Sequence, residues 1–163
     1  MKNLYLIRHA KSSWKNMTLS DFDRPLNNRG KKNAPFMAKL LKKKGLKPDL
    51  IIASPSYRTR KTAHIFADIF KYNKKEILFF ECLYNASKND ILETIKYIDD
   101  KFENLFLIGH NPSLNQFVQE YVNFNENIPT SGIIKIEFDC KRWKETKKNN
   151  AQLIFFEYPK KYN

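Results

Sequence analysis

The sequence predicts an α/β fold, a three-layer sandwich in which helices cover both faces of a central sheet. Two observations predict it. Short apolar segments alternate with helical patterns along the 163 residues, and parallel strands need such crossover helices. The last two strands, at 133–138 and 153–158, have no helix between them, which favours an antiparallel pairing. We therefore expect a mostly parallel central sheet with an antiparallel edge strand.

The expected strands are short apolar runs bounded by polar residues. A buried strand in a parallel sheet has this pattern, because helices cover both of its faces. The six runs are 4–7, 50–53, 77–80, 105–108, 133–138 and 153–158.

Helical patterns fill the intervals between these strands. Gly45 ends a helix within 28–44, and Pro35 inside it predicts a late start or a kink. Asn111 is expected to cap a later helix that begins at Pro112. The remaining helices are expected at 57–70 and 90–98.

The composition is that of a folded protein, with 42% hydrophobic and 14% aromatic residues. No apolar run approaches the roughly 20 residues of a membrane helix. The run from Leu4 to Ile7, before Arg8, is too short for the core of a signal peptide. Cys82 and Cys140 lie far apart in the sequence, which fits a reduced protein. We expect a cytoplasmic protein without a membrane partner.

The net charge of +13 has three interpretations. A basic face could bind nucleic acid through its phosphates. The charge could instead reflect a lysine-rich composition, because six of the 30 basic residues are arginine. It could also draw anionic substrates toward a pocket. We consider nucleic acid an unlikely partner on charge alone.

Polar side chains follow four of the expected strands, at the point where each strand ends. In an open α/β sheet, ligands bind outside the carboxyl ends of the parallel strands. We therefore expect these side chains to converge at one edge of the sheet. They are Arg8 and His9, Arg58 after Ser54, Glu81, and His110.

This group points to an anion, and phosphate fits best. Guanidinium groups bind phosphate oxygens in pairs and stay charged at any working pH. A neutral histidine can attack phosphorus, and a protonated one can stabilise the equatorial oxygens. Each residue alone could be an ordinary surface or turn residue, so the joint placement carries the argument. His64 lies in mid-helix and is read as structural, and the spacing of the three histidines predicts no metal site.

The ordered motifs resemble the histidine phosphatase superfamily, with its phosphoglycerate mutase-like fold, and within it the short SixA-type phosphohistidine phosphatases. The resemblance runs along nearly the whole chain and implies a single domain over 1–163. The matching segments are Arg8-His9-Ala10, Asp23-Arg24-Pro25-Leu26, Ser54-Pro55-Ser56-Tyr57-Arg58, Leu83-Tyr84-Asn85-Ala86, Gly109-His110-Asn111-Pro112 and Pro129-Thr130-Ser131-Gly132.

The resemblance implies a role for each residue of the group. His9 would be the phosphorylated nucleophile. The transferred phosphoryl group would be bound by Arg8, Arg58 and His110, with Arg24 joining from the first loop. Glu81 lies where larger relatives carry a proton donor, and the sequence leaves open whether Glu81, a water molecule or no acid serves here. Neither a cofactor nor a metal is implied.

The expected function is a phosphatase that works through phosphohistidine, with a phosphorylated protein as the favoured substrate. A histidine-containing phosphotransfer domain is one such partner. Two alternatives remain at this stage. One is a small-molecule phosphomonoesterase for sugar phosphates or nucleotides, and the other is a non-catalytic module that binds phosphate or nucleic acid.

Overall fold

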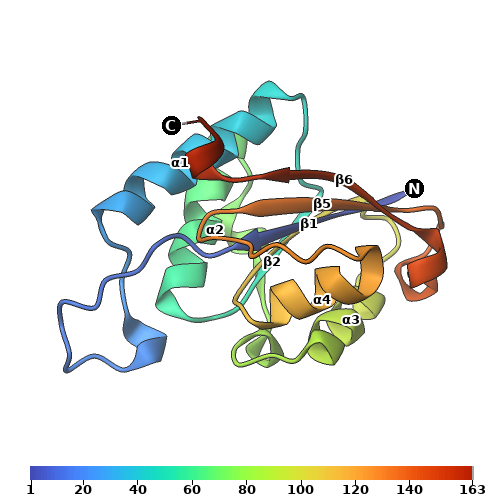
Figure 1. The fold of residues 1–163 in the computed structure, drawn as a ribbon. Coiled ribbons are helices and arrows are strands. Elements are labelled where there is room, and N and C mark those ends of the chain that lie inside the picture. Colours follow the sequence, from blue (N-terminus) through green and yellow to red (C-terminus); the bar gives the residue numbers. More distant parts are fainter. Residues whose placement is uncertain (163) are drawn as a thin grey trace.

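The computed structural model describes residues 1–162, and its centre is a six-stranded sheet with the order β3-β2-β4-β1-β5-β6 (Figure 1). The strands are β1 Lys2–Arg8, β2 Leu50–Ala53, β3 Leu78–Phe79, β4 Asn104–Gly109, β5 Ile133–Phe138 and β6 Ala151–Glu157. The helices are α1 Asn28–Lys43, α2 Tyr57–Phe70, α3 Lys88–Tyr97 and α4 Ser113–Val122. Short 3₁₀ turns, among them Asp21–Asp23 and Glu81–Leu83, lie in the connections.

The directions of the strands confirm the predicted mixed sheet. The four strands from β3 to β1 in this order are parallel to one another. Strand β5 runs antiparallel to both β1 and β6, so the reversed strand lies one position in from the edge. The absence of a helix between β5 and β6 correctly indicated this antiparallel pairing.

Two apolar layers pack against the two faces of the sheet. On β1, Tyr5 and Ile7 belong to a buried cluster with residues of α1 and α2. The alternate residues Leu4 and Leu6 belong to a second cluster with residues of α3 and α4. Side chains alternate across a strand, so a continuous apolar run serves both faces at once. Figure 1 shows α1 and α2 on one side of the sheet and α3 and α4 on the other.

Helix α1 begins earlier than its proline suggested. It starts at Asn28 and continues through Pro35, so the expected late start is wrong. The side chain of Asn27 accepts a hydrogen bond from the Gly30 amide at 2.9 Å and fixes the first turn. The helix ends at Lys43, and Gly45 follows with a φ of 80°, the left-handed conformation that glycine adopts easily.

Other boundaries also differ from the expectations. Strand β3 has two residues rather than four. Helix α4 begins at Ser113, one residue later than expected, with Pro112 at the cap position. Asn111 still contributes to this end, because its side-chain oxygen accepts a hydrogen bond from the Asn115 amide at 3.0 Å. Among residues 1–162, the longest apolar stretches of helix fall short of what a bilayer crossing needs.

Candidate active site

Strands β1 and β4 place two histidines side by side at the carboxyl edge of the sheet. Arg8 pairs with Gly109 in the parallel register, and the next residue on each strand is His9 or His110. The backbone amide of His9 donates to the Gly109 carbonyl at 3.1 Å. The two imidazole rings lie 5.2 Å apart, centre to centre. They line a cavity of about 130 Å³, together with Arg58, Tyr84–Ala86 and Asn111–Ser113.

The imidazole of His9 has one tautomer fixed by the backbone. Its Nδ1 lies 2.8 Å from the carbonyl oxygen of Ala10, so Nδ1 carries the proton and donates it. Nε2 therefore keeps its lone pair. Burial first, and then the nearby His110, Arg58 and Arg8, lower the pKa of His9 to about 3, against the opposing effect of the Ala10 hydrogen bond. His9 is neutral at physiological pH, as a nitrogen nucleophile must be.

His110 is held in the opposite tautomer. Arg58 Nη2 donates toward His110 Nδ1 at 3.4 Å, so the proton of His110 lies on Nε2. Nε2 in turn donates to the hydroxyl oxygen of Ser54 at 2.8 Å. Burial and the charge of Arg58 lower the pKa of His110 to about 4. The protonated form assumed for phosphate stabilisation thus requires a bound anion to raise this pKa.

Arg58 is buried in the first turn of α2 and faces a carboxylate from the 3₁₀ turn at Asp21–Asp23. Nη2 of Arg58 lies 3.0 Å from Asp21 Oδ2, and Nη1 donates to the Asp21 backbone carbonyl at 2.7 Å. The Tyr84 hydroxyl donates to the same Oδ2 at 2.7 Å. Burial raises the pKa of Asp21, but these hydrogen bonds and the arginine charges outweigh it, and the pKa lies below its ordinary value.

Arg24 is buried beside this group but does not line the cavity. Its Nη1 lies 3.5 Å from Asp21 Oδ1, and Nη2 donates to the Ser12 hydroxyl. The guanidinium group stacks on the indole of Trp14, 3.4 Å from the ring centre. Arg24 is thus linked to Arg58 through Asp21. The Asp21 carboxylate lies between Arg24 and the arginine that lines the cavity.

Arg8 is the last residue of β1, directly before His9, and it is not among the residues that line the cavity. Its Nη1 donates to the Ile128 carbonyl at 3.0 Å, and its buried Nε has no hydrogen-bond partner among the described residues. The pKa of Arg8 is lowered first by burial and then by the charge of Arg58. Its charge in turn contributes to the low pKa of both His9 and His110.

The structure does not bring Glu81 to the cavity. Glu81 is exposed, at the start of the 3₁₀ turn Glu81–Leu83, and the cavity is lined instead by residues that follow this turn, from Tyr84 onward. His64 is on α2, 6.4 Å from the Phe79 ring and outside the cavity, as expected for a structural histidine.

The sequence did not predict that Asp21 contacts Arg58. It also did not predict that Ser54 contacts His110 or that Tyr84 contacts Asp21. Tyr84 and Ser54 stand in the quoted motifs, but a motif does not tell which atoms they contact. Asp21 carries no sequence signal, because one acidic residue in a polar loop is typical of solvent-exposed chain.

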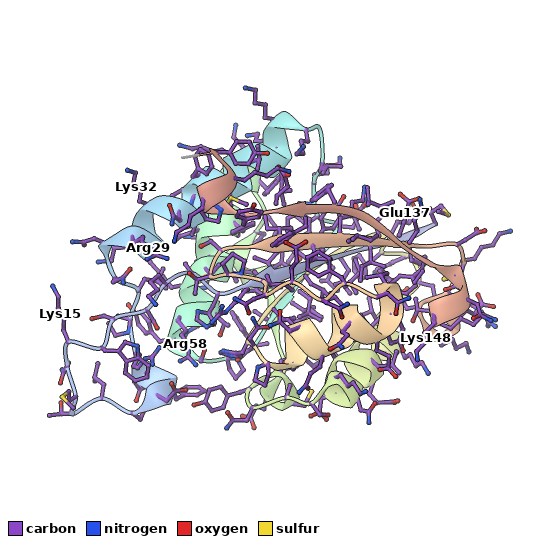
Figure 2. The ribbon with its side chains drawn as sticks, in the orientation of Figure 1. Lys15, Arg29, Lys32, Arg58, Glu137 and Lys148 are labelled. Atoms are coloured by element: carbon purple, nitrogen blue, oxygen red, sulfur yellow. The ribbon has the colours of Figure 1, made fainter. Side chains whose placement is uncertain are left out.

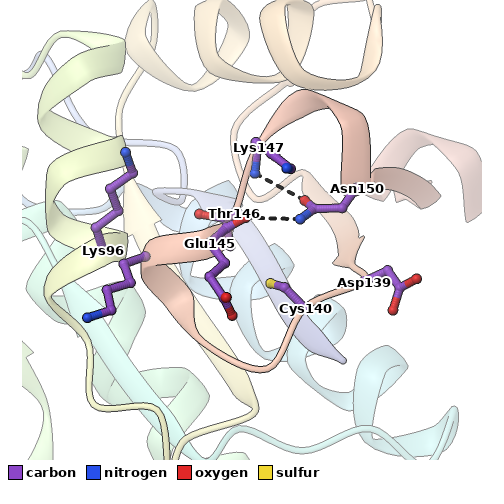
Figure 3. Close-up of a pocket in the computed structure, with 8 residues that line it drawn as sticks. Lys96, Asp139, Cys140, Glu145, Thr146, Lys147 and Asn150 are labelled. Carbon is purple, nitrogen blue, oxygen red and sulfur yellow. Dashed lines mark hydrogen bonds between the residues drawn. The ribbon is translucent and has the colours of Figure 1, made fainter.

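A larger cavity, of about 660 Å³, lies at the opposite edge of the sheet, beside α3 and the β5–β6 connection (Figure 3). Its lining consists of lysines, carboxylates, Cys140, Thr146 and Asn150. It contains neither of the two buried histidines nor an arginine, so the larger cavity is not where the strand-end residues gather.

Comparisons with known proteins give matches both in sequence and in structure. The family model of the histidine phosphatase superfamily (branch 1) matches residues 4–80. An uncharacterized chloroplastic protein of Arabidopsis thaliana is 32% identical over 118 residues, which are 68% of this chain and 54% of that protein. The chain thus matches about half the length of this relative.

Two solved structures match over nearly their whole length. The SixA protein of Agrobacterium tumefaciens, to which phosphohistidine phosphatase activity is ascribed by name, superposes with a TM-score of 0.82 and 28% identity, over 97% of this chain and 98% of that one. The protein histidine phosphatase SixA, solved with tungstate, has a TM-score of 0.84 and 18% identity, over 99% of both chains. The chain belongs to the histidine phosphatase superfamily, and its fold is that of the SixA-type members.

Proposed function

We propose that this protein hydrolyses phosphorylated substrates through a phosphohistidine intermediate on His9, and that protein phosphohistidine is its favoured substrate. Membership of the superfamily supports a phosphatase. The observation that carries the proposal is the 2.8 Å hydrogen bond from His9 Nδ1 to the Ala10 carbonyl, which leaves Nε2 as a neutral nucleophile in a cavity beside Arg58.

The reaction has two displacements at phosphorus. In the first, the lone pair of His9 Nε2 forms a bond to phosphorus while the bond to the leaving group breaks, and the leaving group takes the electron pair. In the second, water attacks phosphorus and the phosphorus–Nε2 bond breaks; one proton of the water stays on the inorganic phosphate, and the other goes to solvent and balances the proton that the leaving group takes up. Nε2 recovers its lone pair, so the cycle consumes water and no cofactor.

Arg8, Arg58 and His110 are the groups proposed to hold the transferred phosphoryl group. Preorganised donors stabilise the charge on its equatorial oxygens. A bound dianion near His110 would raise the pKa of this histidine from about 4, since an opposite charge favours the protonated form. Binding and protonation of His110 would then support each other.

The nature of the leaving group explains how the reaction could proceed without Glu81. An imidazole leaving group departs more easily than an alkoxide and needs less help from an acid. Because Glu81 lies outside the cavity, we assign it no proton transfer. The exposed position of Glu81 is compatible with a leaving group that needs little acid assistance, such as the imidazole of phosphohistidine.

The size of the cavity points in the same direction. At about 130 Å³ it is well below the roughly 300–1,000 Å³ of sites that enclose a drug-sized ligand. It accommodates a phosphoryl group, with the rest of the substrate outside. A phosphorylated side chain on a protein surface fits this description, whereas an enclosed sugar phosphate or nucleotide does not.

The decisive experiment traps the intermediate. The protein is mixed with excess phosphoramidate, quenched within milliseconds at alkaline pH, and weighed intact by mass spectrometry, beside His9→Ala and the control His64→Ala. We expect an acid-labile phosphate adduct in the wild type and in His64→Ala, and neither adduct nor phosphate release in His9→Ala. Phosphate release that survives in His9→Ala would overturn the mechanism. A wild type without adduct or release would favour a binding module.

Substrate class is tested with the same three proteins on a panel. A histidine-phosphorylated phosphotransfer domain is compared with glucose 6-phosphate, a nucleoside monophosphate and p-nitrophenyl phosphate by their kcat/KM. The proposal expects the phosphoprotein to have the highest value. A sugar phosphate or nucleotide that exceeds it would assign the protein to small phosphoesters instead.

A further inference from the structure

One long segment of this protein carries positive charge and no negative charge. Residues 24–48 contain nine of the 30 basic residues and no aspartate or glutamate. Most of this segment is α1, whose 16 residues hold six of the nine. Residues 141–148 are also strongly basic but include Glu145, whereas 24–48 is the longest run of the sequence without a carboxylate.

The outer face of α1 carries a continuous row of exposed side chains. Arg29, Lys32, Phe36 and Lys39 follow one another at intervals of three or four residues, which places them in one row along a helix. We call these four residues the α1 stripe. Ten residues at 1.5 Å each make it roughly 15 Å long. Phe36 is 41% exposed and lies between the two lysines.

The cations of the stripe make no ion pair with the side chains of residues 1–162. Across residues 1–162, no ion pair within 4.0 Å involves Arg29, Lys32 or Lys39. Asp21, by contrast, neutralises part of the charge of Arg24 and Arg58 in the active site. The charge of the stripe is therefore available to another molecule.

Two adjoining cavities lie along the stripe. The first, about 320 Å³, is bounded by Arg29, Lys32 and Asn33 on α1, by Pro129 and Thr130, and by Tyr158, Pro159 and Lys160 near the C-terminus. The second, about 230 Å³, shares Lys32 and Asn33 and continues to Phe36 and Lys39. Together they form a shallow groove with cations along it and apolar rings on its walls.

The groove begins beside the candidate active site. Thr130, which lines its first cavity, precedes Ser131, and the Ser131 amide donates to the carbonyls of Arg8 and His9 at 3.1 and 3.2 Å. Figure 2 shows Arg29, Lys32 and Arg58 on the same side of the molecule, with Lys148 on the other. The backbone that borders one end of the groove is thus hydrogen-bonded to the backbone at His9.

We propose that the α1 stripe is the docking surface for an acidic helix of the phosphorylated protein substrate. Carboxylates at intervals of three or four residues on that helix would match the spacing of Arg29, Lys32 and Lys39, and its apolar residues would contact Phe36. This inference rests on the proposed function, since it places the phosphohistidine of the same partner at His9. Rim charges of this kind act mainly on association and its salt dependence.

The test uses two variants with the same change of charge. Lys32→Glu/Lys39→Glu reverses the stripe, and Lys96→Glu/Lys144→Glu reverses two exposed lysines at the distant cavity of Figure 3. The milder Lys32→Gln/Lys39→Gln serves as a second stripe variant, and circular dichroism checks that all four proteins are folded. The substrates are two helical phosphohistidine peptides, identical except for glutamates or glutamines at three- and four-residue intervals, and phosphoramidate.

We expect the wild type to prefer the glutamate peptide through a KM that is roughly tenfold lower at low salt, where charges act over about 30 Å. The stripe reversal should abolish this preference and leave phosphoramidate turnover unchanged. The reversal at Lys96 and Lys144 should leave both unchanged. A wild type without the preference, or equal losses in both reversals, would overturn the proposal.

Binding is measured separately from turnover. Fluorescence anisotropy with the unphosphorylated glutamate peptide reports docking even if none of the phosphorylated compounds is hydrolysed, so failure of the phosphatase proposal and failure of the docking proposal are distinguished. A single-stranded RNA oligonucleotide is included. The proposal would be overturned in favour of a nucleic-acid surface if the wild type binds the RNA but not the peptide, and if the stripe reversal abolishes RNA binding.

Discussion

Asp21 holds Arg58 by two bonds, one to each terminal nitrogen of the guanidinium group. Nη1 donates to its backbone carbonyl at 2.7 Å and Nη2 to its carboxylate at 3.0 Å. The same carboxylate accepts a hydrogen bond from Tyr84, across the mouth of the cavity. Asp21 thereby orients the arginine proposed to bind phosphate and also competes with phosphate for it.

If the Asp21 carboxylate competes with phosphate for Arg58, the Asp21→Asn variant should bind tetrahedral anions more tightly than the wild type does. The substitution removes one negative charge beside Arg58 and Arg24 while the backbone carbonyl still holds Nη1. We expect the inhibition constant of tungstate or orthovanadate to fall about tenfold, which corresponds to about 1.4 kcal/mol. Asp23→Asn is the control, because Asp23 accepts a hydrogen bond from Ser20 instead. Weaker inhibition of Asp21→Asn would mean that orientation of Arg58 outweighs competition.

Ser54 is predicted to act as a positioning residue through His110. Its hydroxyl oxygen accepts the Nε2 proton of His110 at 2.8 Å and so keeps Nδ1 unprotonated toward Arg58. In Ser54→Ala we expect kcat to fall about tenfold, the order of one lost hydrogen bond, with a smaller change in KM. Nitrogen-15 spectra of the imidazole should show both tautomers of His110. An unchanged tautomer with reduced kcat would assign Ser54 a purely structural effect.

The buried histidines predict how stability depends on pH. Burial lowers the pKa of His9 to about 3 from an ordinary 6.5, so its stabilising contribution is full above about pH 6.5 and is lost as the pH falls below it. At pH 5 the unfolded chain has taken up this proton and the folded protein has not, at a cost of about 2 kcal/mol.

Urea unfolding of the wild type and His9→Gln at pH 7.5 and pH 5 measures this contribution. The free energy of unfolding should fall more in the wild type, by about 2 kcal/mol, because the variant lacks the titrating group. His110 and His64, whose pKa values are also lowered, are present in both proteins and cancel in the difference. Equal falls in the two proteins would contradict the low pKa of His9.

Glu157 is predicted to stabilise the C-terminal turn. This buried carboxylate at the end of β6 accepts hydrogen bonds from Lys161, at 2.6 Å, and from Tyr162, and it lies 3.9 Å from Lys44 beyond α1. Glu157→Gln should lower the free energy of unfolding by about 1–3 kcal/mol, as for other buried groups that lose a charged partner. Glu126→Gln, at an exposed position, is the control. Denaturant unfolding of both variants measures the free energy of unfolding, and equal values for the two variants would contradict the prediction.

The sequence predicted best those features of the fold that follow from a local pattern of residues. Apolar runs predicted the strands because the sheet is covered on both faces, and the parallel register then brought His9 and His110 together. Of the two effects expected from Pro35, the late start is wrong, because α1 begins at Asn28 beside the Asn27 cap, and the kink stays a prediction. Arg24 contacts Asp21 and Ser12, and the role in phosphoryl binding that the resemblance implies for it stays a prediction.

What escaped prediction depends on contacts between distant segments. Asp21 meets Arg58 37 residues away and Tyr84 63 residues away, and neither spacing has a local pattern. The tautomers of the two histidines likewise depend on partners that only the folded arrangement supplies, the Ala10 carbonyl and the Ser54 hydroxyl. Glu81 follows a strand as the pattern requires, but the chain turns before its side chain can reach the cavity.

Gly30 packs against the loop that follows the nucleophile. A β carbon at this position would lie 2.2 Å from the carbonyl oxygen of Lys11, two residues after His9, so the backbone of α1 and that loop are in direct contact. In a screen of random substitutions, position 30 would therefore behave like a catalytic residue and tolerate no side chain. Purified protein would tell the two apart, since a Gly30 variant should fail in its fold as well as in its turnover.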